Sequence, residues 1–498
     1  MLTIEEIKQF IDEDAASTKK ILAKKGQAYY DGDHDIKDCR LFYYNSDGNL
    51  VEDKTRSNIK IPHPFFTELV DQAVQYVLSV KDGIIKSDIP ELQTELDSYF
   101  NENEDFIAEI SELLTDCQTK GFAYMYLYKN EDDRTSFQCA DSIGVIEVEA
   151  RFADDKKDHV LYWYIDRIDK DGNKIKRIMD FDSELVYYYT QKSDGEIKVD
   201  EDVKVNPKPH TLYKKDGDDN TYYDVLGYIP FFRMDNNKKQ VTSLKPIKPL
   251  IDDYDIHASS LTNNLIDFDT PLHVVKGFQG DNLEELQQNL KTKKIIGVDD
   301  DGGVEVHTVD IPYQARQAKL DLDEKNIYKF GMGLNTSALK DTNATTNVAI
   351  KAAYSLLDLK CSKIRINLKR ILRKILKPVI EEINKFNGTD YQMKDIYFNL
   401  DKPEIMSNAQ ENAQNELTEA QKMQTVINTL LAIATYLDNE TLMQLICEQL
   451  DIDYDDIKDK LPDPDEAENA VKDAQNGLDS VVVKDEQTTE GNPTITTE

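Results

Sequence analysis

A single helical pattern, running from Val348 to Phe386, constrains the fold of this chain more than any other feature of its sequence. Apolar residues recur there at alternating steps of four and three, which places them in one stripe along an α-helix. The stripe consists of Ile350, Tyr354, Leu357, Cys361, Ile364, Leu368, Ile371 and Ile375. Residue types that cap helices precede it at Thr345–Asn347, and Gly388 is a suitable stop. At about 1.5 Å per residue the helix would be about 60 Å long, so other parts of the chain must be arranged along it. Pro378 lies inside the pattern and predicts a kink.

The middle of this helix is strongly basic. Between Leu359 and Ile380 it contains no acidic residue. The basic residues are Lys360, Lys363, Arg365, Lys369, Arg370, Arg373, Lys374 and Lys377. Two interpretations stay open. One is a solvated face that pairs with acidic neighbours in the fold, and the other is a contact surface for an acidic partner or a nucleic acid.

The chain as a whole is acidic, with 95 Asp and Glu against 60 Lys and Arg and a net charge of −35. Tight binding of duplex DNA depends on Lys and Arg that displace counterions from phosphates, so this balance argues against such binding. A negative surface would still suit a protein that lets DNA pass along it.

The cysteines and the apolar runs indicate a reducing compartment and no membrane span. The five cysteines are scattered and never form C-x-x-C, which argues against a structural zinc site. The apolar runs are far shorter than the roughly 20 residues that cross a bilayer. The acidic, amphipathic segment Met1–Phe10 is not expected to be a signal peptide. We expect several domains in 498 residues, and neither a metal nor a cofactor.

The first part of the chain is expected to be helical and then to form an antiparallel sheet. The predicted helices are Met1–Lys25, with a capping box at Thr3 and Glu6, then Pro64–Val80, Ile89–Phe100 and Asp105–Thr119. The predicted strands are Phe122–Lys129, Gly144–Phe152, His159–Ile165, Lys174–Phe181 and Glu184–Gln191. Asp169–Asn173 is interpreted as a hairpin turn rather than a calcium loop, because no Glu closes it at the twelfth position. Ser193–Tyr223 is expected to be a polar excursion of the sheet.

The second half of the chain predicts two more helices around a small insert. The first helix starts near Pro249 and ends before Pro271, on the pattern Tyr254, Ala258, Leu261, Leu265 and Phe268. The insert is expected to contain strand Leu272–Val275, helix Leu283–Leu290, strand Lys294–Val298, a hairpin turn at Asp299–Gly303 and strand Val304–Val309. The second helix is Ala315–Phe330, and a polar loop joins it to the long helix. One strand at Ile396–Leu400, helices at Asn408–Tyr436 and Glu440–Gln449, and an acidic end follow. The fold class is therefore α+β.

No catalytic motif is present. The sequence lacks the phosphate-binding loop, the dinucleotide fingerprint, the zinc-protease H-E-x-x-H and the hydrolase G-x-S-x-G. His257 could be poised by Asp253 or Asp255, but an ordinary surface histidine is the simpler interpretation. We therefore expect that the protein is not an enzyme.

Several local strings, and the order of the parts, resemble the portal proteins of tailed bacteriophages, in particular the siphophage type common in phages of Gram-positive bacteria. The strings are YYDGDHDI at Tyr29–Ile36, NIKIPHPFFTELVDQAVQYVLS at Asn58–Ser79, GYIPFF with NNKK at Gly227–Lys239, and KPLIDDYDIHASSLTNNLIDFDTPLHVVKGFQG at Lys248–Gly280. The resemblance covers nearly the whole chain up to about residue 450. The acidic end from Asp451 to Glu498 has no counterpart in it.

The resemblance implies a portal architecture of wing, stem, clip and crown, with long stem helices, a long wing helix and an antiparallel sheet in the wing. It assigns residues 1–240 to the wing, 245–270 and 313–334 to the stem helices, 271–312 to the clip, 335–347 to a tunnel loop, 348–404 to the long helix and 405–461 to the crown. For 462–498 it is the acidic composition, not the resemblance, that predicts a disordered tail. The implied tunnel-loop residues, which would line a DNA channel, are Asn335, Thr336, Ser337, Lys340, Asp341, Thr342, Asn343, Thr345 and Thr346. The implied stem residues are Asp252, Asp253, Tyr254, Asp255, Asn263, Asn264 and Asp267.

The resemblance also implies a function. Portal proteins form a ring, usually of twelve copies, at one capsid vertex of the virion after assembly in the host cytoplasm. The implied partners are the terminase large subunit, a head-completion or adaptor protein, the capsid and scaffolding proteins, and double-stranded DNA that passes without sequence preference. Two alternatives stay open: a scaffold or adaptor that forms no ring, which particle symmetry would reveal, and a metal-dependent nucleic-acid enzyme, which nuclease activity would reveal.

Overall fold

The computed structural model divides the chain into two compact units. The described residues are 2–54, 56–80, 83–130, 133–149, 157–192, 195–214, 221–268, 272–278, 282, 284, 286, 298–307, 312–336, 347–400, 409–437 and 439–449. One unit comprises Met1–Ala344 and Val348–Ile405, and the other comprises Thr345–Asn347 and Met406–Glu498.

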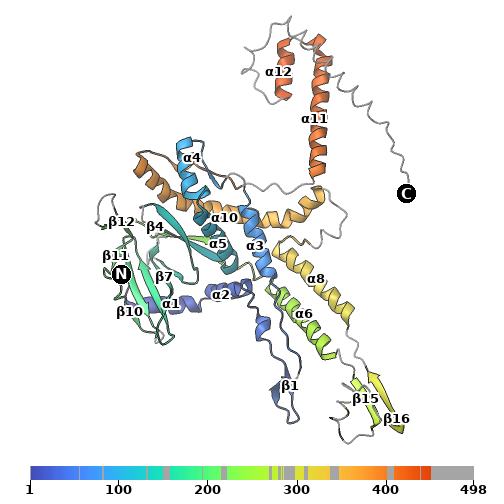
Figure 1. Ribbon diagram of the computed structural model, residues 1–498. Helices are drawn as coiled ribbons and strands as arrows, with labels where there is room; N and C mark the ends of the chain where they lie inside the picture. The colour runs from blue at the N-terminus through green and yellow to red at the C-terminus, as the bar shows by residue number, and fades with distance from the viewer. Residues whose placement is uncertain are drawn as a thin grey trace, which may run out of the picture. The chain divides into compact units, whose positions relative to one another are not determined.

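Helices and antiparallel strands both occur in the larger unit (Figure 1). Among the residues that the structure describes, the α-helices are α1 (Ile4–Ala16), α2 (Thr18–Tyr30), α3 (Phe65–Leu78), α4 (Pro90–Leu96), α5 (Glu104–Lys120), α6 (Lys248–Phe268), α8 (Tyr313–Gly331), α10 (Asn347–Asn387), α11 (Ala409–Ala432) and α12 (Asn439–Gln449). The strands are β1 (Phe42–Tyr44), β2 (Leu50–Glu52), β3 (Ile85–Lys86), β4 (Phe122–Lys129), β5 (Thr135–Ala140), β6 (Val145–Glu149), β7 (Lys157–Ile168), β8 (Lys174–Phe181), β9 (Leu185–Gln191), β10 (Ile197–Val199), β11 (Lys208–Pro209), β12 (Thr211–Lys214), β13 (Thr221–Asp224), β14 (Phe231–Asp235), β15 (Leu272–Phe278), β16 (Val298–His307) and β17 (Tyr397–Phe398). This mixture of helix and antiparallel sheet agrees with the predicted class.

The prediction of one helix at the start of the chain is wrong, because α1 and α2 are separate. Ser17 adopts an extended backbone between them, and its hydroxyl accepts a hydrogen bond from the Lys20 amide as the N-cap of α2. An apolar pattern alone cannot reveal this break, since serine occurs both inside helices and at their caps. The capping box predicted at Thr3 and Glu6 is confirmed.

The long helix predicted from Val348 to Phe386 is confirmed as α10. It has 41 residues and ends just before Gly388, which adopts a φ of +63° that suits glycine. The predicted stripe is its buried side from Leu357 to Ile375. Pro378 lies inside the helix, and the kink expected there stays a prediction.

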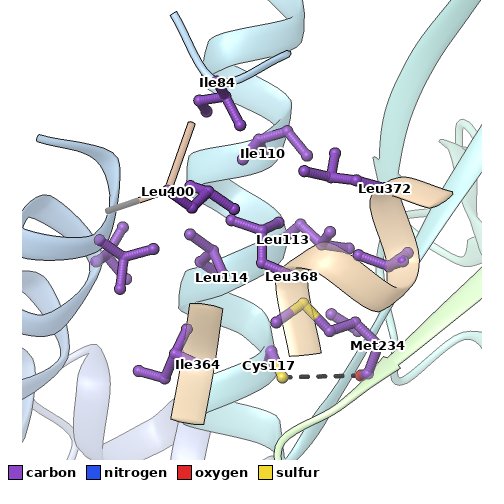
Figure 2. Close-up of a cluster of buried hydrophobic side chains, with 14 of the residues drawn as sticks. Ile84, Ile110, Leu113, Leu114, Cys117, Met234, Ile364, Leu368, Leu372 and Leu400 are labelled. Atoms are coloured by element: carbon purple, nitrogen blue, oxygen red, sulfur yellow. Dashed lines mark hydrogen bonds between the residues drawn. The ribbon is translucent and has the colours of Figure 1, made fainter. Parts of the chain in front are cut away.

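The buried side of α10 packs on α3 and α5 in one continuous hydrophobic core. Figure 2 shows Leu368 and Leu372 of α10 pointing toward Leu113 of α5, with Ile84 and Leu400 beside them. The helices predicted at Pro64–Val80 and Asp105–Thr119 are confirmed as α3 and α5. The prediction Ile89–Phe100 is confirmed as α4, which a short π-helical turn, η2 (Asp97–Asn101), continues. The strand predicted at Ile396–Leu400 is the shorter β17, which pairs with β3.

The predicted antiparallel sheet is two sheets, and β4 belongs to the smaller one. That sheet has the order β14-β4-β5, whereas the larger sheet has the order β10-β9-β8-β7-β6, with β11 also paired to β9. Side chains of β4 alternate between two cores: Met125 and Leu127 face the helices, and Phe122 and Tyr124 face the larger sheet. The far side of the larger sheet packs on α1 through Ile7. Helices, small sheet, large sheet and α1 therefore form successive layers.

Several turns and short strands refine the sequence interpretation. The hairpin turn predicted at Asp169–Asn173 is confirmed: it joins β7 to β8, and the Asp169 carboxylate accepts from the Asp171 and Asn173 amides. The predicted excursion Ser193–Tyr223 contains β10 and β11, which pair with the larger sheet, and β12 with part of β13, which pair with each other. Strand β5 was not predicted.

Helices α6 and α8 lie side by side, and β15 and β16 form a two-stranded ribbon between their sequences (Figure 1). Both helices are confirmed. The hairpin turn predicted at Asp299–Gly303 is wrong, because β16 runs through these residues and pairs with β15. The turn-forming residues instead make a bulge: Gly303 pairs with Lys276, and Val298 pairs with Phe278. The predictions Leu283–Leu290 and Lys294–Val298 fall almost wholly outside the described residues.

The smaller unit contains the helices α11 and α12 and the short turn η5 (Ala434–Tyr436). They confirm the predictions Asn408–Tyr436 and Glu440–Gln449. The acidic end of the chain, for which disorder was predicted, lies outside the described residues.

A buried lysine fixes α2 to the larger sheet. Lys20 is 1% exposed, and its Nζ donates to the backbone oxygens of Ser142, Ile143 and Val145 at 2.6, 2.9 and 2.8 Å. Burial lowers the pKa of Lys20 to about 8, although the Asp14 carboxylate lies 3.1 Å away.

This lysine predicts a pH dependence of stability. Between pH 8 and the ordinary lysine pKa of 10.5, the unfolded chain holds a proton that the native state releases, so the Lys20 contribution to the free energy of unfolding rises with pH. Lys20→Met lacks this contribution. We expect the difference between wild type and variant, measured by urea titration, to grow by about 2–3 kcal/mol across this window. Lys19→Met, at a side chain that is 32% exposed, is the control and should follow wild type. A difference that does not change with pH would contradict the assignment.

Candidate functional site

The predicted stem residues lie on α6, and the buried side of this helix is polar. After Ile251, its buried side chains are Asp255 and Ser259, one helical turn apart. Leu265, which belongs to the apolar pattern that predicted the helix, is 50% exposed. The pattern therefore predicted the helix correctly but did not identify the face that packs inside the subunit.

Four polar side chains of α6 bind the backbone of an extended segment, residues 57–63. They form a row with a spacing of four residues, which we call the polar row: Asp255, Ser259, Asn263 and Asp267. They accept from the amides of His63, Ile61, Ile59 and Ser57 at 2.9, 3.1, 2.7 and 3.1 Å. The Asn263 amide group also donates to the Ile59 carbonyl oxygen at 3.0 Å.

The two spacings match because four helical residues rise about 6 Å and two extended residues span about 6.6 Å. Every second amide of the segment can thus meet the next member of the polar row. The segment obtains from helix side chains the hydrogen bonds that a sheet would otherwise supply.

Asp255 also joins two histidines at the buried end of the row. Its carboxylate lies 2.7 Å from His34 Nδ1 and 2.9 Å from His63 Nδ1. The other ring nitrogen of His34 lies 3.2 Å from the Tyr29 carbonyl oxygen. Both ring nitrogens of His34 therefore lie within hydrogen-bond distance of oxygen atoms. Burial tends to raise the pKa of Asp255, but the hydrogen bonds from His34 and His63 outweigh it and hold that pKa below its ordinary value.

Lys248 and Asp252 tie the start of α6 to α2 and the turn that follows it. Lys248 Nζ lies 2.7 Å from carboxylate oxygens of both Asp35 and Asp252, and the Tyr29 hydroxyl donates to Asp252. Burial and the hydrogen bond to Asp252 raise the pKa of Tyr29. Desolvation opposes the charge on Lys248, but its bonds to the two carboxylates prevail and raise its pKa.

Helix α6 is linked to α8 by Asp253. The Lys319 ammonium group of α8 bridges Asp253 and Asp323, and His257 lies 3.4 Å from Asp253. The hydrogen bond from Lys319 lowers the pKa of Asp253. His257 is thus part of a surface ion-pair group, in keeping with the simpler interpretation of its sequence position. Tyr254 packs edge-on against His63 and Phe65, with ring centroids 4.7 and 4.8 Å away.

The predicted loop after α8 is described only at its start. Asn335 Nδ2 donates to Glu324 at 3.1 Å, and Thr336 is exposed. The remaining predicted loop residues lie outside the described residues: Ser337, Lys340, Asp341, Thr342, Asn343, Thr345 and Thr346.

The two helices on either side of this loop are fixed to α3. The Gln72 side chain bonds both the amide and the carbonyl of Leu334, at 2.9 and 3.1 Å. Lys360 of α10 donates to the carbonyl oxygens of Leu69 and Gly331, both at 3.2 Å. Burial lowers the pKa of Lys360 to about 8. Residue Leu334, just before the loop, is therefore held by α3, and α3 also contacts α10 further along its length, at Lys360.

The structure brings most predicted stem residues into one contact network, but it adds residues that the sequence did not single out. The additions are His34, His63, Lys248, Ser259 and Lys319. Asn264 is partly exposed next to the network. The sequence did contain one signal for these contacts, namely the spacing of four residues between members of the polar row. The signal was missed because the apolar side of the helix was assumed to be the buried side.

This network positions helices and offers no catalytic arrangement. Within the described ranges, no cluster of three or more His, Cys, Asp or Glu side chains could hold a metal ion. In that same part of the chain, no helix combines the length and apolar character needed to cross a membrane.

Comparison with known proteins identifies what this arrangement resembles. Residues 8–453 match the family model described as phage portal protein, SPP1 Gp6-like. The portal protein of Bacillus phage SPP1 is 26% identical over 386 residues, which cover 74% of this chain and 73% of that protein. The portal protein of Clostridium phage phiCD119 is 23% identical over 392 residues, or 76% of this chain and 82% of that one. The resemblance stated from the sequence is confirmed.

Solved structures give a weaker likeness. A chain in a structure described as the neck of native GTA particle, computed with C12 symmetry, is 10% identical with a TM-score of 0.37, covering 77% of this chain and 89% of that chain. A second, described as the neck of empty GTA particle, computed with C6 symmetry, is 12% identical at the same TM-score, covering 77% and 90%. The relationship to known proteins therefore rests on the family match and the sequence relatives.

The polar row predicts that one asparagine, but not its neighbour, protects the extended segment. Asn263→Ala removes both hydrogen bonds to Ile59, so we expect the Ile59 amide to exchange with solvent roughly fivefold faster, corresponding to about 1 kcal/mol. Hydrogen–deuterium exchange with mass spectrometry of residues 57–63 measures this. Asn264→Ala, one position along α6, is the matched control and should leave exchange unchanged. Equal exchange in both variants would show that the segment is held by other contacts.

Proposed function

Because this chain belongs to the phage portal protein family described as SPP1 Gp6-like, we propose that about twelve copies of it form a closed ring around a channel for double-stranded DNA. The family match over residues 8–453 is the observation that carries the proposal. Membership of this family makes the chain a structural protein of the phage particle rather than an enzyme.

The proposal assigns a place in the ring to each part of the chain. Residues 1–240 with α10 form the wing, α6 and α8 form the stem, β15 and β16 belong to the clip, and α11 and α12 belong to the crown. Residues 335–347 form the tunnel loop and 462–498 an acidic tail. The order α6, ribbon, α8, loop, α10 supports this assignment, since two adjacent helices joined at one end by a small insert can serve as one segment of a channel wall.

The contacts of α6 suit a rigid wall. Asp255, Asp252 and Asp253 are each bound within the subunit, to His34, Lys248 and Lys319. A helix held at its start by α2 and along its length by residues 57–63 can keep its position while DNA moves past it. The ring would sit at one vertex of the capsid, with copies assembling in the host cytoplasm.

The charge of the ring suits sliding rather than gripping. A ring of about twelve copies at −35 each would carry about −420, which repels phosphate. Lys340 is the single cation between Asn335 and Asn347, and we assign it a weak contact to passing phosphates.

The same proposal names the partners. The terminase large subunit would pump DNA through the channel, a head-completion or adaptor protein would dock on the ring after packaging, and capsid and scaffolding proteins would surround it. A scaffold or adaptor that forms no ring is the alternative.

Mass measurement tests the ring directly. We expect light scattering on the purified protein, alone or with its scaffolding protein, to give a species of about 690 kDa, since the chain has a mass of 57.1 kDa. A compact dimer or tetramer as the largest species under both conditions would contradict the proposal.

The role assigned to Lys340 predicts an effect on DNA packaging. In Lys340→Ala the only cation of the loop is lost, and we expect fewer particles to complete packaging, by about two- to fivefold, because one weak phosphate contact per subunit is worth well under 1 kcal/mol. The readout is nuclease-resistant DNA per particle. Lys340→Arg keeps the charge and is the control, which should package as wild type does. Unchanged packaging in Lys340→Ala would remove the assigned role.

A further inference from the structure

The basic middle of α10 has only part of the acidic surroundings that a solvated, ion-paired face requires. Arg365 is buried and lies 3.6 Å from Asp358, and Lys360 is bound to backbone carbonyls. In contrast, Lys363, Arg370 and Lys377 are exposed and make no ion pair within the part of the chain that the structure describes. We call the exposed side from Leu359 to Lys377 the cationic face.

The cationic face carries an electrostatic cost within the single chain. Arg370 and Arg373 lie three residues apart, and Arg373 and Lys377 lie four apart, so like charges are neighbours on the helix surface. Each such pair destabilises a helix by roughly 0.2–0.5 kcal/mol. The acids that could offset this cost are absent from α10 itself between Leu359 and Ile380. An acidic surface outside the subunit would offset it.

Exposed aliphatic side chains lie among these cations. Leu359 is 63% exposed and Ile366 is 61% exposed on the same side of α10. Leu359 and Lys363 also line a groove of about 770 Å³, together with Phe330 and Pro246. A phosphate backbone offers nothing apolar for these side chains, whereas a protein surface does. The mixture of cations and aliphatic side chains therefore favours a protein partner over nucleic acid.

A complementary acidic surface exists elsewhere on the same subunit. Asp31 at the end of α2, Asp71 of α3 and Glu112 of α5 are exposed and surround Tyr30, whose hydroxyl lies 2.8 Å from Asp71. Burial, Asp71, Glu112 and Asp31 together raise the pKa of Tyr30, which indicates that all three carboxylates act on the same place. We call these three residues the acidic face.

The acidic face and the cationic face do not meet within one subunit. Helices α3 and α10 turn their buried sides toward the same hydrophobic core. Asp71 and Arg370 are on the exposed sides of these helices, and no ion pair joins the two faces in the described ranges. A closed ring needs two different surfaces of this kind on each subunit, one for each neighbour.

We propose that the cationic face of α10 docks on the acidic face of the next copy of this chain. The inference rests on the proposed ring and specifies the contact that closes it. Arg370 and Lys377 meet the carboxylates of Asp31, Asp71 and Glu112, while Leu359 and Ile366 supply apolar contact at the edge. Each subunit gives one face to one neighbour and the other face to the second, so the contact repeats around the ring.

Charge reversal tests the contact. In the double variant Arg370→Glu with Lys377→Glu, repulsion replaces attraction at every subunit boundary, and we expect the subunit concentration for half-assembly to rise roughly tenfold or more. The matched control is Lys170→Glu with Lys174→Glu, which makes the same charge change at two exposed lysines of the β7–β8 turn. The control should assemble as wild type does. Native mass spectrometry and light scattering report assembly, and circular dichroism of dissociated subunits checks folding.

Reversing the charges on both faces at once tests whether the acidic face is the partner of the cationic face. Asp71→Lys with Glu112→Lys should also weaken assembly, and combining it with the α10 double variant should restore rings to within about threefold of wild type. Loss of assembly without this rescue would overturn the assignment of the acidic face. Full assembly of the α10 double variant would overturn the contact altogether, and a packaging defect in those intact rings would assign the cationic face to DNA. Absence of rings in the wild type would instead contradict the proposed function.

Discussion

The structure depends on the hydrogen bonds between the polar row of α6 and the backbone of residues 57–63. An extended segment without a sheet partner leaves amides unsatisfied, and each unpaired amide that is shielded from water costs about 1–3 kcal/mol. Asp255, Ser259, Asn263 and Asp267 satisfy these amides at every second residue. In doing so they fix the direction in which α6 leaves the helical core. Asp255 extends the same contacts to His34 and His63, so α6 and the N-terminal helices are positioned together.

A second set of contacts fixes the end of α8. Lys360 on α10 and Gln72 on α3 bind backbone groups where α8 ends, at Gly331 and Leu334. Lys20, which is buried, and Lys360, which is half-buried, thus serve as hydrogen-bond donors to backbone carbonyls rather than as members of a surface charge pattern. Lys363, Arg370 and Lys377 of α10 differ from them in this respect, because they are exposed and bind no backbone carbonyl among the residues that the structure describes. The basic residues of α10 therefore have two roles. Lys360 binds backbone carbonyls inside the subunit, whereas the exposed cations lie on its surface.

The sequence predicts the long elements well because their patterns repeat many times. Helix α10 shows its stripe over five turns and more, and its bounds agree with the prediction at both ends. Single residues decide the features that the sequence interpretation missed. Ser17 breaks α1 from α2, and Gly303 pairs across a bulge instead of closing a hairpin. The partner of a strand is not encoded in its own alternation, which is why β4 was placed in the wrong sheet. The buried side of α6 was missed because a polar row was not expected to face the interior.

The central claim is that α6 and α8 form the wall of a channel whose narrowest point is the loop between Asn335 and Asn347. A single-particle reconstruction of the assembled protein tests it most directly. The account predicts a central hole lined by α6 and α8 of every copy, with that loop projecting furthest toward the axis and residues 57–63 on the side of α6 away from it. A particle without a hole, or a hole lined by the sheet of β6 to β10, would contradict the account.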